Sequence, residues 1–264
     1  MRILITNDDG IGARGLEVLE AIATDLAGPS GEVWIVAPAF EQSGVGHCIN
    51  YVRPSMLQQI GPRRVAVEGS PADCVLAGLG DVVDGQVDLV LSGVNRGNNA
   101  GENTVYSGTI GAAMEASLQG VRSVALSQFF GPGNVDLGDP FEAAAAHGTA
   151  LIRRLLDGAP WGGDTYKVFY NVNFPPVAAD HVRGAAAVAQ GYRGDRRMGV
   201  HPQTSPAGRK YLWIAGSAQG ERTAPGTDVA ANLDGWISVT PMRCDLTCRE
   251  TLSGMDGVLD PYES

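Results

Sequence analysis

Residues 3–10 have the sequence Ile-Leu-Ile-Thr-Asn-Asp-Asp-Gly, an apolar run followed by two adjacent acids, and a helical pattern comes next. Such a run is typical of a buried parallel strand. Asp8 and Asp9 therefore fall at its carboxyl end, the edge of an open α/β sheet where ligands bind. Neighbouring carboxylates are unfavourable unless water, a proton or a cation relieves their repulsion. We therefore expect a divalent metal here; ordinary turn chemistry, with Asp9 capping the next helix, is the alternative.

Strand and helix patterns alternate along the first two thirds of the chain. Apolar runs predict strands at residues 2–6, 33–36, 87–91, 121–126 and 167–174. Apolar residues at helical spacing predict helices at 16–26 and 107–118, and a third helix that Asp139-Pro140 opens with a capping carboxylate and a proline at the first helical position. This alternation indicates an α/β fold with a mostly parallel sheet and helices on both faces.

The pattern changes after residue 180. Residues 190–209 are rich in Gly, Pro, Arg and Gln, and strand-like runs follow at 211–215 and 236–240 with no helical period between them. We therefore expect one domain over residues 1–264, in which the segment 180–264 includes an antiparallel β-hairpin that acts as an oligomerisation arm. An isolated two-stranded ribbon is marginal in water, so this arm predicts a homodimer or a homotetramer. An arm folded back on its own subunit is the alternative.

The formal net charge of −10 argues against binding to a nucleic-acid duplex, because basic surfaces bind that backbone. A small phosphorylated substrate stays compatible with this charge, since a local cation can reverse the field at one site. The sequence shows neither a secretory signal nor an apolar run of membrane-spanning length. We therefore expect a cytoplasmic protein that does not bind to membranes.

Polar residues follow three of the predicted strands. The first strand supplies Asp8 and Asp9, the second supplies Ser43 in a Gln-Ser-Gly turn, and the third supplies Asn95 within the glycine-rich stretch 92–98. Carboxylate, hydroxyl and amide oxygens are hard donors, which suit Mg²⁺, Mn²⁺ or Ca²⁺ better than zinc or copper. The sequence therefore predicts a divalent ion at this edge of the sheet.

The predicted helix that begins at Ser107-Gly108-Thr109 follows the third of these segments. Its first N–H groups lack intrahelical partners, and Gly108 allows an anion to approach the backbone closely. The hydroxyls of Ser107 and Thr109 can donate as well, so a phosphate could lie between the metal and this helix. The alternative is that Ser107 only caps the helix.

Several other enzyme classes lack their motifs here. The glycine-rich stretch 92–98 matches neither a GxGxxG dinucleotide fingerprint nor a GxxxxGK[ST] phosphate loop, and no Gly-x-Ser-x-Gly nucleophile elbow occurs. A haloacid-dehalogenase-type phosphatase would have its two acids separated by one residue, whereas Asp8 and Asp9 are adjacent. These classes are therefore disfavoured.

The chain as a whole resembles the SurE family of survival-protein phosphatases. Matching motifs occur in order over nearly the whole sequence, at residues 3–11, 36–38, 42–44, 69–75, 92–98, 107–113, 171–175, 208–209, 227–228 and 237–241. The resemblance implies a metal-dependent hydrolase of nucleoside 5′-monophosphates and of nucleoside 3′-monophosphates. It also implies a Rossmann-like core and a C-terminal hairpin arm that exchanges between subunits.

The resemblance further implies roles for individual residues. The family's metal ligands correspond to Asp8, Asp9, Ser43 and Asn95. Its phosphate contacts correspond to the turn Ser107-Gly108-Thr109, with Asn98 as a weaker candidate. Either acid could also orient water or act as a base, so Asp8 and Asp9 are the candidate catalytic residues.

Two segments depart from the family pattern: residues 45–50, where Asn50 stands in place of the expected threonine, and residues 196–207. We expect both to border the substrate pocket or the subunit interface, which leaves the leaving-group preference open. A non-catalytic nucleotide-binding module and a metal-dependent nucleotide-sugar transferase stay open as alternative functions. The transferase prefers acids separated by one residue, and this chain lacks that spacing.

Overall fold

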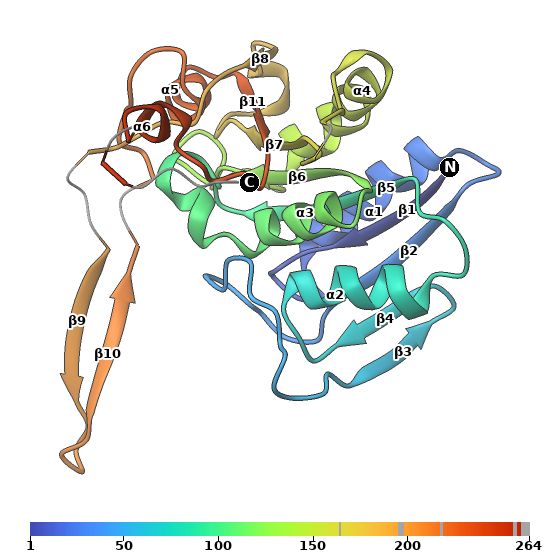
Figure 1. The fold of residues 1–264 in the computed structure, drawn as a ribbon, viewed down its shortest axis with the longest axis horizontal. Coiled ribbons are helices and arrows are strands. Elements are labelled where there is room, and N and C mark those ends of the chain that lie inside the picture. Colours follow the sequence, from blue (N-terminus) through green and yellow to red (C-terminus); the bar gives the residue numbers. More distant parts are fainter. Residues whose placement is uncertain (164, 195–197, 217–218, 256–257, 260–264) are drawn as a thin grey trace.

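A computed structural model describes residues 1–163, 165–194, 198–216, 219–255 and 258–259. Within these residues a nine-stranded sheet has the order β3-β4-β2-β1-β5-β6-β7-β11-β8 (Figure 1). Its strands are β1 (Arg2–Thr6), β2 (Glu32–Pro38), β3 (Leu57–Gly61), β4 (Arg64–Val67), β5 (Leu89–Arg96), β6 (Arg122–Gln128), β7 (Phe169–Phe174), β8 (Ala185–Ala187) and β11 (Ile237–Met242). The strands from β4 to β7 are parallel, whereas β3 and β11 run antiparallel to their neighbours β4 and β7. The predicted mostly parallel α/β fold is confirmed.

Helices cover both faces of the sheet. On one face α1 (Arg14–Ala27) packs against α4 (Glu142–Gly158), and on the other α2 (Pro71–Ala77) packs against α3 (Gly108–Leu118) (Figure 1). Successive side chains of β1 point to opposite faces, so Ile3 and Ile5 join the core under α1 and α4, and Leu4 joins the core under α2 and α3. The shorter helices are η1 (Gly78–Val82), η2 (Gly101–Tyr106), η3 (Ala179–His181), α5 (Asp228–Leu233) and α6 (Arg249–Ser253). Among the described residues, no helix has both the length and the apolar character needed to cross a membrane.

Two predicted elements differ from the observed ones at their ends. The strand predicted at 87–91 begins at Leu89 and continues to Arg96, so most of the glycine-rich stretch is the end of β5. The helix predicted from Asp139-Pro140 begins only at Glu142, without a side-chain cap. Asp139 forms a turn instead: its carbonyl accepts the N–H of Glu142 (3.1 Å), and its carboxylate binds the guanidinium of Arg14 (2.7 Å).

The sequence patterns do not predict β3, β4 or α2. Strand β3 reads Leu-Gln-Gln-Ile-Gly and is largely exposed, so it lacks the apolar run that marks the central strands. Helix α2 has only seven residues, too few to show helical spacing. It is held by a capping box, in which the Ser70 hydroxyl accepts the N–H of Asp73 (3.0 Å) and the Asp73 carboxylate accepts the N–H of Ser70 (2.8 Å).

The C-terminal hairpin consists of β9 (Gly199–Thr204) and β10 (Lys210–Ala215), which pair antiparallel and project from the body (Figure 1). A hairpin is therefore present as predicted, but its strands are not the predicted pair. The run at 236–240 belongs to β11 in the main sheet, and α5 separates it from β10. The prediction was wrong on this point because an apolar run indicates a strand without indicating its partner.

Candidate metal and phosphate site

Asp8 lies at the carboxyl end of β1 with only 4% of its surface exposed. Its Oδ1 accepts a hydrogen bond from the Thr109 hydroxyl (2.7 Å), and its Oδ2 accepts one from the Thr109 N–H (3.3 Å). The following turn is closed by Asn7, whose amide donates to the carbonyl of Gly10 (2.8 Å). Gly10 has a φ of +97°, a conformation that favours glycine. The turn after β1 and the start of α3 therefore hold the Asp8 carboxylate from two sides.

Asp9 is partly exposed and lines a neighbouring concavity of about 290 Å³ together with Arg14, Glu41 and Arg96. Its Oδ2 accepts the N–H of Arg96 at the end of β5 (3.0 Å). Helix α1 begins at Arg14 and has no side-chain cap, so Asp9 does not act as the helix cap that the alternative interpretation proposed.

A cleft of about 300 Å³ lies where the ends of β1, β2 and β5 meet the start of α3. Its lining also includes residues from η2 and residues that flank the base of the hairpin, before β9 and after β10. The lining residues are Asp8, Ser43, Gly44, Asn95, Arg96, Asn98, Asn99, Asn103, Tyr106, Ser107, Met198, Gly216 and Gln219. The structure thus brings five of the predicted site residues into one cleft: Asp8, Ser43, Asn95, Asn98 and Ser107.

Ser43 and Asn95 offer oxygen atoms to this cleft. The Ser43 hydroxyl donates to the Glu41 carboxylate (2.8 Å), so its oxygen keeps its lone pairs. The Asn95 amide nitrogen donates to the carbonyl of Gly97 (2.9 Å), and Oδ1 has no partner within the described part of the chain, so it could coordinate a cation. Among the described residues, no group of three or more His, Cys, Asp and Glu side chains is placed to hold a metal ion. A cation at this cleft would therefore need hydroxyl and amide oxygens besides the acids, the kind of donor set that suits Mg²⁺ or Mn²⁺.

The electrostatics of the two acids also fit a cation. Burial raises the pKa of the Asp8 carboxyl to about 6, against the opposing effect of the Thr109 hydroxyl, and the charge of Asp9 adds to the rise. Burial likewise raises the pKa of Asp9, whereas the N–H of Arg96 lowers it. Both ionised forms are thus disfavoured in the protein alone. A divalent ion would relieve this, so the residues present fit a metal site.

Divalent-metal binding is expected to weaken as the pH falls through about 6, because a proton on Asp8 then competes with the cation. Below that pH the dissociation constant for Mn²⁺ should rise roughly tenfold per pH unit. Metal-free stability should instead fall as the pH rises from about 4 to about 6, since folding raises the pKa of Asp8 from 3.8. Calorimetric titration of Mn²⁺ from about pH 5 to pH 8 tests the first expectation, and a dissociation constant independent of pH would contradict it.

The start of α3 forms the second wall of the cleft. Ser107 is the N-cap of this helix: its Oγ accepts the N–H of Ile110 (3.1 Å), and the residue also lines the cleft. Gly108 lies close against Asp8, because a Cβ at this position would be 3.0 Å from the Asp8 Cβ and 3.1 Å from the Pro71 Cγ. The capping interpretation of Ser107 is therefore correct, and the capped helix end is also part of the cleft.

Asn98 and Thr109 differ in what they offer a phosphate. Asn98 is 1% exposed and lines the cleft, and its Nδ2 has no hydrogen-bond partner within the part of the chain that is described. An unpaired buried donor is costly, and a ligand oxygen would satisfy it. Thr109 is fully buried, and its hydroxyl is taken by Asp8. The structure thus places Thr109 behind Asp8 and not at the surface of the cleft.

Thr109→Val is expected to weaken Mn²⁺ binding about tenfold, because valine has the shape of threonine but cannot donate to Asp8 Oδ1. Losing a hydrogen bond to a buried carboxylate disfavours its ionised form by about 1–3 kcal/mol, and the cation binds that form. Thr109→Ser keeps the hydroxyl and should bind Mn²⁺ nearly as wild type does. Calorimetry measures Mn²⁺ binding to both variants. Equal dissociation constants for Thr109→Val and Thr109→Ser would contradict the role of the Thr109 hydroxyl in metal binding.

Several lining residues are absent from the predicted site. Arg96 and Asn99 lie in or beside the stretch 92–98, so that motif already indicated their position. Met198 comes just before β9 and Gln219 comes after β10, so both reach the cleft from the base of the hairpin, and no local pattern predicts this. Met198 belongs to the divergent segment 196–207, so that segment does border the cleft; residues 196 and 197 lie outside the described residues.

The other divergent segment, residues 45–50, does not line this cleft. It contributes to a separate concavity of about 400 Å³ that it shares with the start of α2. His47 Nε2 lies 2.7 Å from the Glu115 carboxylate on α3, and the N–H of Asn50 donates to Asp73 on α2 (3.0 Å). The unusual residues of this segment therefore form hydrogen bonds with α3 and α2.

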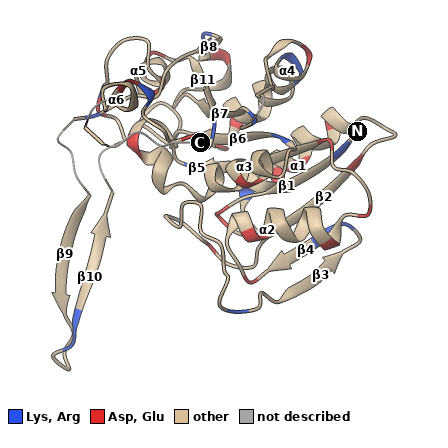
Figure 2. Ribbon diagram, viewed as in Figure 1, with Lys and Arg blue, Asp and Glu red and all other residues tan. Residues whose placement is uncertain are grey.

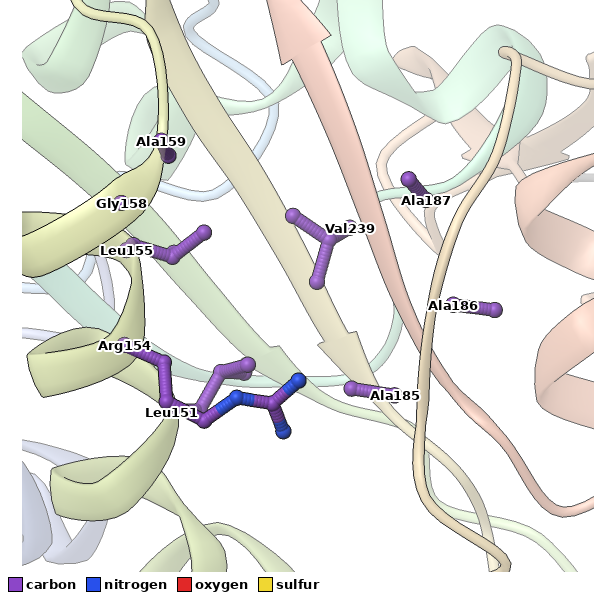
Figure 3. A pocket seen from close by; sticks show the side chains of 9 residues that line it. All are labelled: Leu151, Arg154, Leu155, Gly158, Ala159, Ala185, Ala186, Ala187 and Val239. Atoms are coloured by element: carbon purple, nitrogen blue, oxygen red, sulfur yellow. The ribbon is translucent and has the colours of Figure 1, made fainter.

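A further pocket of about 250 Å³ lies between α4 and the β8–β11 edge of the sheet (Figure 3). Its described lining is mostly aliphatic, with Arg154 as the charged member. Among the described lining residues no set of polar groups converges, so this pocket lacks the polar groups found in the cleft at the strand ends.

Comparison with known proteins shows which family the chain resembles. The sequence profile of the family described as Survival protein SurE matches residues 3–197. The 5′-nucleotidase SurE of Ruegeria pomeroyi is 62% identical over 260 residues, and the match covers 98% of this chain and 100% of that protein. The 5′-nucleotidase SurE of Jannaschia sp. is 61% identical over 264 residues, again covering 98% of this chain and 100% of that protein.

A solved structure shares the fold as well. The crystal structure of the SurE protein from Aquifex aeolicus superposes with a TM-score of 0.78 at 33% identity, and the match covers 98% of this chain and 100% of that one. The family profile and the relatives both extend over most of the sequence. The chain therefore belongs to the SurE family of survival proteins.

Proposed function

We propose that this chain is a metal-dependent phosphomonoesterase that hydrolyses nucleoside 5′-monophosphates to nucleoside and phosphate, with nucleoside 3′-monophosphates as a second substrate class. One observation carries the proposal: a single cleft combines the buried acid Asp8, the unpaired amide of Asn98 and the amino terminus of α3. An acid at this position suits a cation, and the other two groups suit a phosphate. The name 5′-nucleotidase, carried by the similar proteins, agrees with this chemistry.

The proposed metal site consists of Asp8, Asp9, Ser43 and Asn95, which supply oxygen atoms only. One divalent ion per subunit, Mg²⁺ or Mn²⁺, fits this set, and Ca²⁺ would be accepted by the same donors in crystals. When bound, such an ion polarises a phosphoryl oxygen and offsets the negative charge that develops on it.

The chain's own residues would then divide the remaining tasks. The N–H of Gly108, which has no partner among the described residues, and the Asn98 amide would bind the non-bridging phosphate oxygens, because the next N–H groups of α3 already bind Asp8 and Ser107. Both oxygens of Asp8 accept hydrogen bonds from Thr109, so Asp8 is held in one orientation. The N–H of Arg96 binds Oδ2 of Asp9, and Oδ1 has no hydrogen bond within the described residues. Asp9 is therefore our candidate to orient the attacking water and accept its proton at Oδ1.

We also propose that the single domain of residues 1–264 assembles through the β9–β10 hairpin into a homodimer or homotetramer. Large apolar side chains are exposed along both strands, among them Val200, Leu212, Trp213 and Ile214. A closed symmetric assembly would cover them, because the same hairpin on a second copy offers a matching surface.

Phosphate release from a panel of substrates tests the proposed function. Chelator-treated protein is supplied with Mg²⁺ or Mn²⁺ and offered 5′-nucleotides, 3′-nucleotides, p-nitrophenyl phosphate and nucleotide-sugars. Nucleoside monophosphates should release phosphate only after the metal is restored. Tight nucleotide binding without phosphate release would indicate a binding module, and cleavage of nucleotide-sugars alone would indicate a transferase; either result would contradict the proposal.

A further inference from the structure

The proposed metal ligand Ser43 lies on a long loop, residues 39–50, which follows β2 and contains neither helix nor strand. Two glycines come shortly after it, Gly44 with a φ of +79° and Gly46 with a φ of +57°. Glycine has more backbone freedom than any other residue. The position of Ser43 is therefore not fixed by secondary structure, and it depends on the contacts that the loop makes.

Two backbone hydrogen bonds hold the loop on either side of this ligand. The N–H of Gln42 donates to the carbonyl of Asp8 (2.7 Å), and the N–H of Gly46 donates to the carbonyl of Tyr106 (3.0 Å). Gly46 also lies directly against α3, because a Cβ at Gly111 would clash with the carbonyl oxygen of Gly46. The loop thus extends from the end of β1 to the surface of α3.

A side-chain contact joins the loop to the middle of α3. His47 Nε2 lies 2.7 Å from Oε2 of Glu115, and because a carboxylate oxygen accepts, His47 donates. The other oxygen of Glu115 accepts a hydrogen bond from Gln119 Nε2 (2.7 Å). The Glu115 side chain is only 8% exposed, and a buried carboxylate is costly unless its oxygens are hydrogen-bonded. Glu115 therefore favours the loop position in which His47 reaches it.

Helix α3 consequently contacts two strand-end segments of the proposed metal site. At its start Thr109 binds Asp8 (2.7 Å), and farther along Glu115 binds the loop that carries Ser43. Ser43 lines the cleft, whereas His47 is not among its described lining residues. The contact between His47 and Glu115 can thus act on a bound cation through the position of the loop.

We propose that His47 and Glu115 are positioning residues for the metal site: they hold residues 39–50 against α3, and this places the Ser43 hydroxyl where it can bind the cation. The inference rests on the proposed function, because it needs the proposed metal site. It also gives the divergent segment 45–50, to which His47 belongs, a role in metal binding that does not require contact with the substrate.

Calorimetric titration of Mn²⁺ into chelator-treated protein provides the first test. His47→Ala should raise the dissociation constant about tenfold or more, the effect expected when a residue that orients a metal ligand is lost. His47→Gln keeps an N–H donor at nearly the distance of Nε2 and should bind Mn²⁺ nearly as wild type does. The matched control is His147→Ala on α4, where Nε2 also makes one hydrogen bond, with the carbonyl of Ala179 (2.8 Å); it should leave the dissociation constant unchanged.

A double-mutant cycle separates positioning of Ser43 from a general effect on the fold. When Ser43→Ala is already present, His47→Ala should change the dissociation constant less than about twofold, because its effect passes through Ser43. A residue that only stabilised the fold would have the same effect in both backgrounds. Hydrogen exchange of the metal-free protein adds a readout without a cation: the amides of Gln42 and Gly46 should exchange faster in His47→Ala than in wild type.

The outcomes distinguish this proposal from the proposed function. If the wild type bound Mn²⁺ with the expected dependence on His47 yet released no phosphate, the proposed function would fail and the positioning role would stand. An unchanged dissociation constant in His47→Ala, or an equal loss with and without Ser43, would overturn the positioning role even in an active phosphomonoesterase.

Discussion

Asp9→Asn is expected to reduce metal-dependent phosphate release about a thousandfold or more while the fold stays intact. A bound divalent ion contributes several kcal/mol to such a reaction, and each 1.4 kcal/mol or so corresponds to about a tenfold change in rate. Asparagine removes a charge from the proposed metal site and the proposed proton acceptor with it. Its oxygen can still accept the N–H of Arg96, so the local backbone contact survives. Phosphate release from 5′-AMP and a circular dichroism spectrum measure the two expectations together.

Asp8→Asn should abolish activity and should also raise the stability of the metal-free protein. Burial raises the pKa of Asp8 from 3.8 to about 6, so its ionised form lowers the metal-free stability at neutral pH by up to about 3 kcal/mol. The neutral variant should therefore unfold at a higher temperature than metal-free wild type at pH 7. Asp180→Asn, at a side chain that is 82% exposed, is the matched control and should change neither quantity. Near-wild-type turnover of Asp9→Asn would contradict the metal mechanism.

Replacing Leu212 and Trp213 by glutamate is expected to convert the assembly into monomers. These side chains are 67% and 64% exposed on β10. Figure 2 shows that Lys, Arg, Asp and Glu are spread over the body and are nearly absent from β9 and β10. Among the residues of these two strands, Lys210 alone belongs to these four types. A two-stranded ribbon with large apolar side chains and little charge is marginal alone and prone to pairing, so a partner should bury it. Carboxylates at these positions would oppose that burial.

Light scattering at micromolar concentration measures this effect. The wild type should have at least twice the chain mass of 27.5 kDa, and the double variant should have the mass of one chain. Tyr51→Glu introduces the same charge at an aromatic side chain that is 90% exposed outside the hairpin, and it should leave the mass unchanged. A wild type that has the monomeric mass and full activity would refute assembly through the hairpin.

The core of the fold follows from short local patterns. Ile3, Leu4 and Ile5 form one apolar run because β1 is buried on both faces, and such a run predicts a central parallel strand. Strand β11 shows the limit of this reasoning. The run at 236–240 predicts a strand, but its place in the main sheet depends on pairing with β7, which no local pattern carries.

In the candidate site, too, local sequence patterns predict some features, and other features depend on tertiary packing. Asp8, Ser43 and Asn95 were predicted because each comes at or shortly after the end of a central strand, and parallel strands end at one edge of the sheet. Spacing could not separate the roles of Ser107 and Thr109. Both stand at the start of α3, but only the packing of α3 against the end of β1 decides that the Thr109 hydroxyl binds Asp8.

The most direct test of the account is a titration of Mn²⁺ into chelator-treated protein, in which metal binding and phosphate release from 5′-AMP are recorded in the same samples. The account predicts that one Mn²⁺ binds per chain, that phosphate release rises in parallel with this binding, and that Asp8→Asn and Asp9→Asn lose both. Phosphate release at the full rate before any Mn²⁺ is added, or at sites that bind no Mn²⁺, would contradict it.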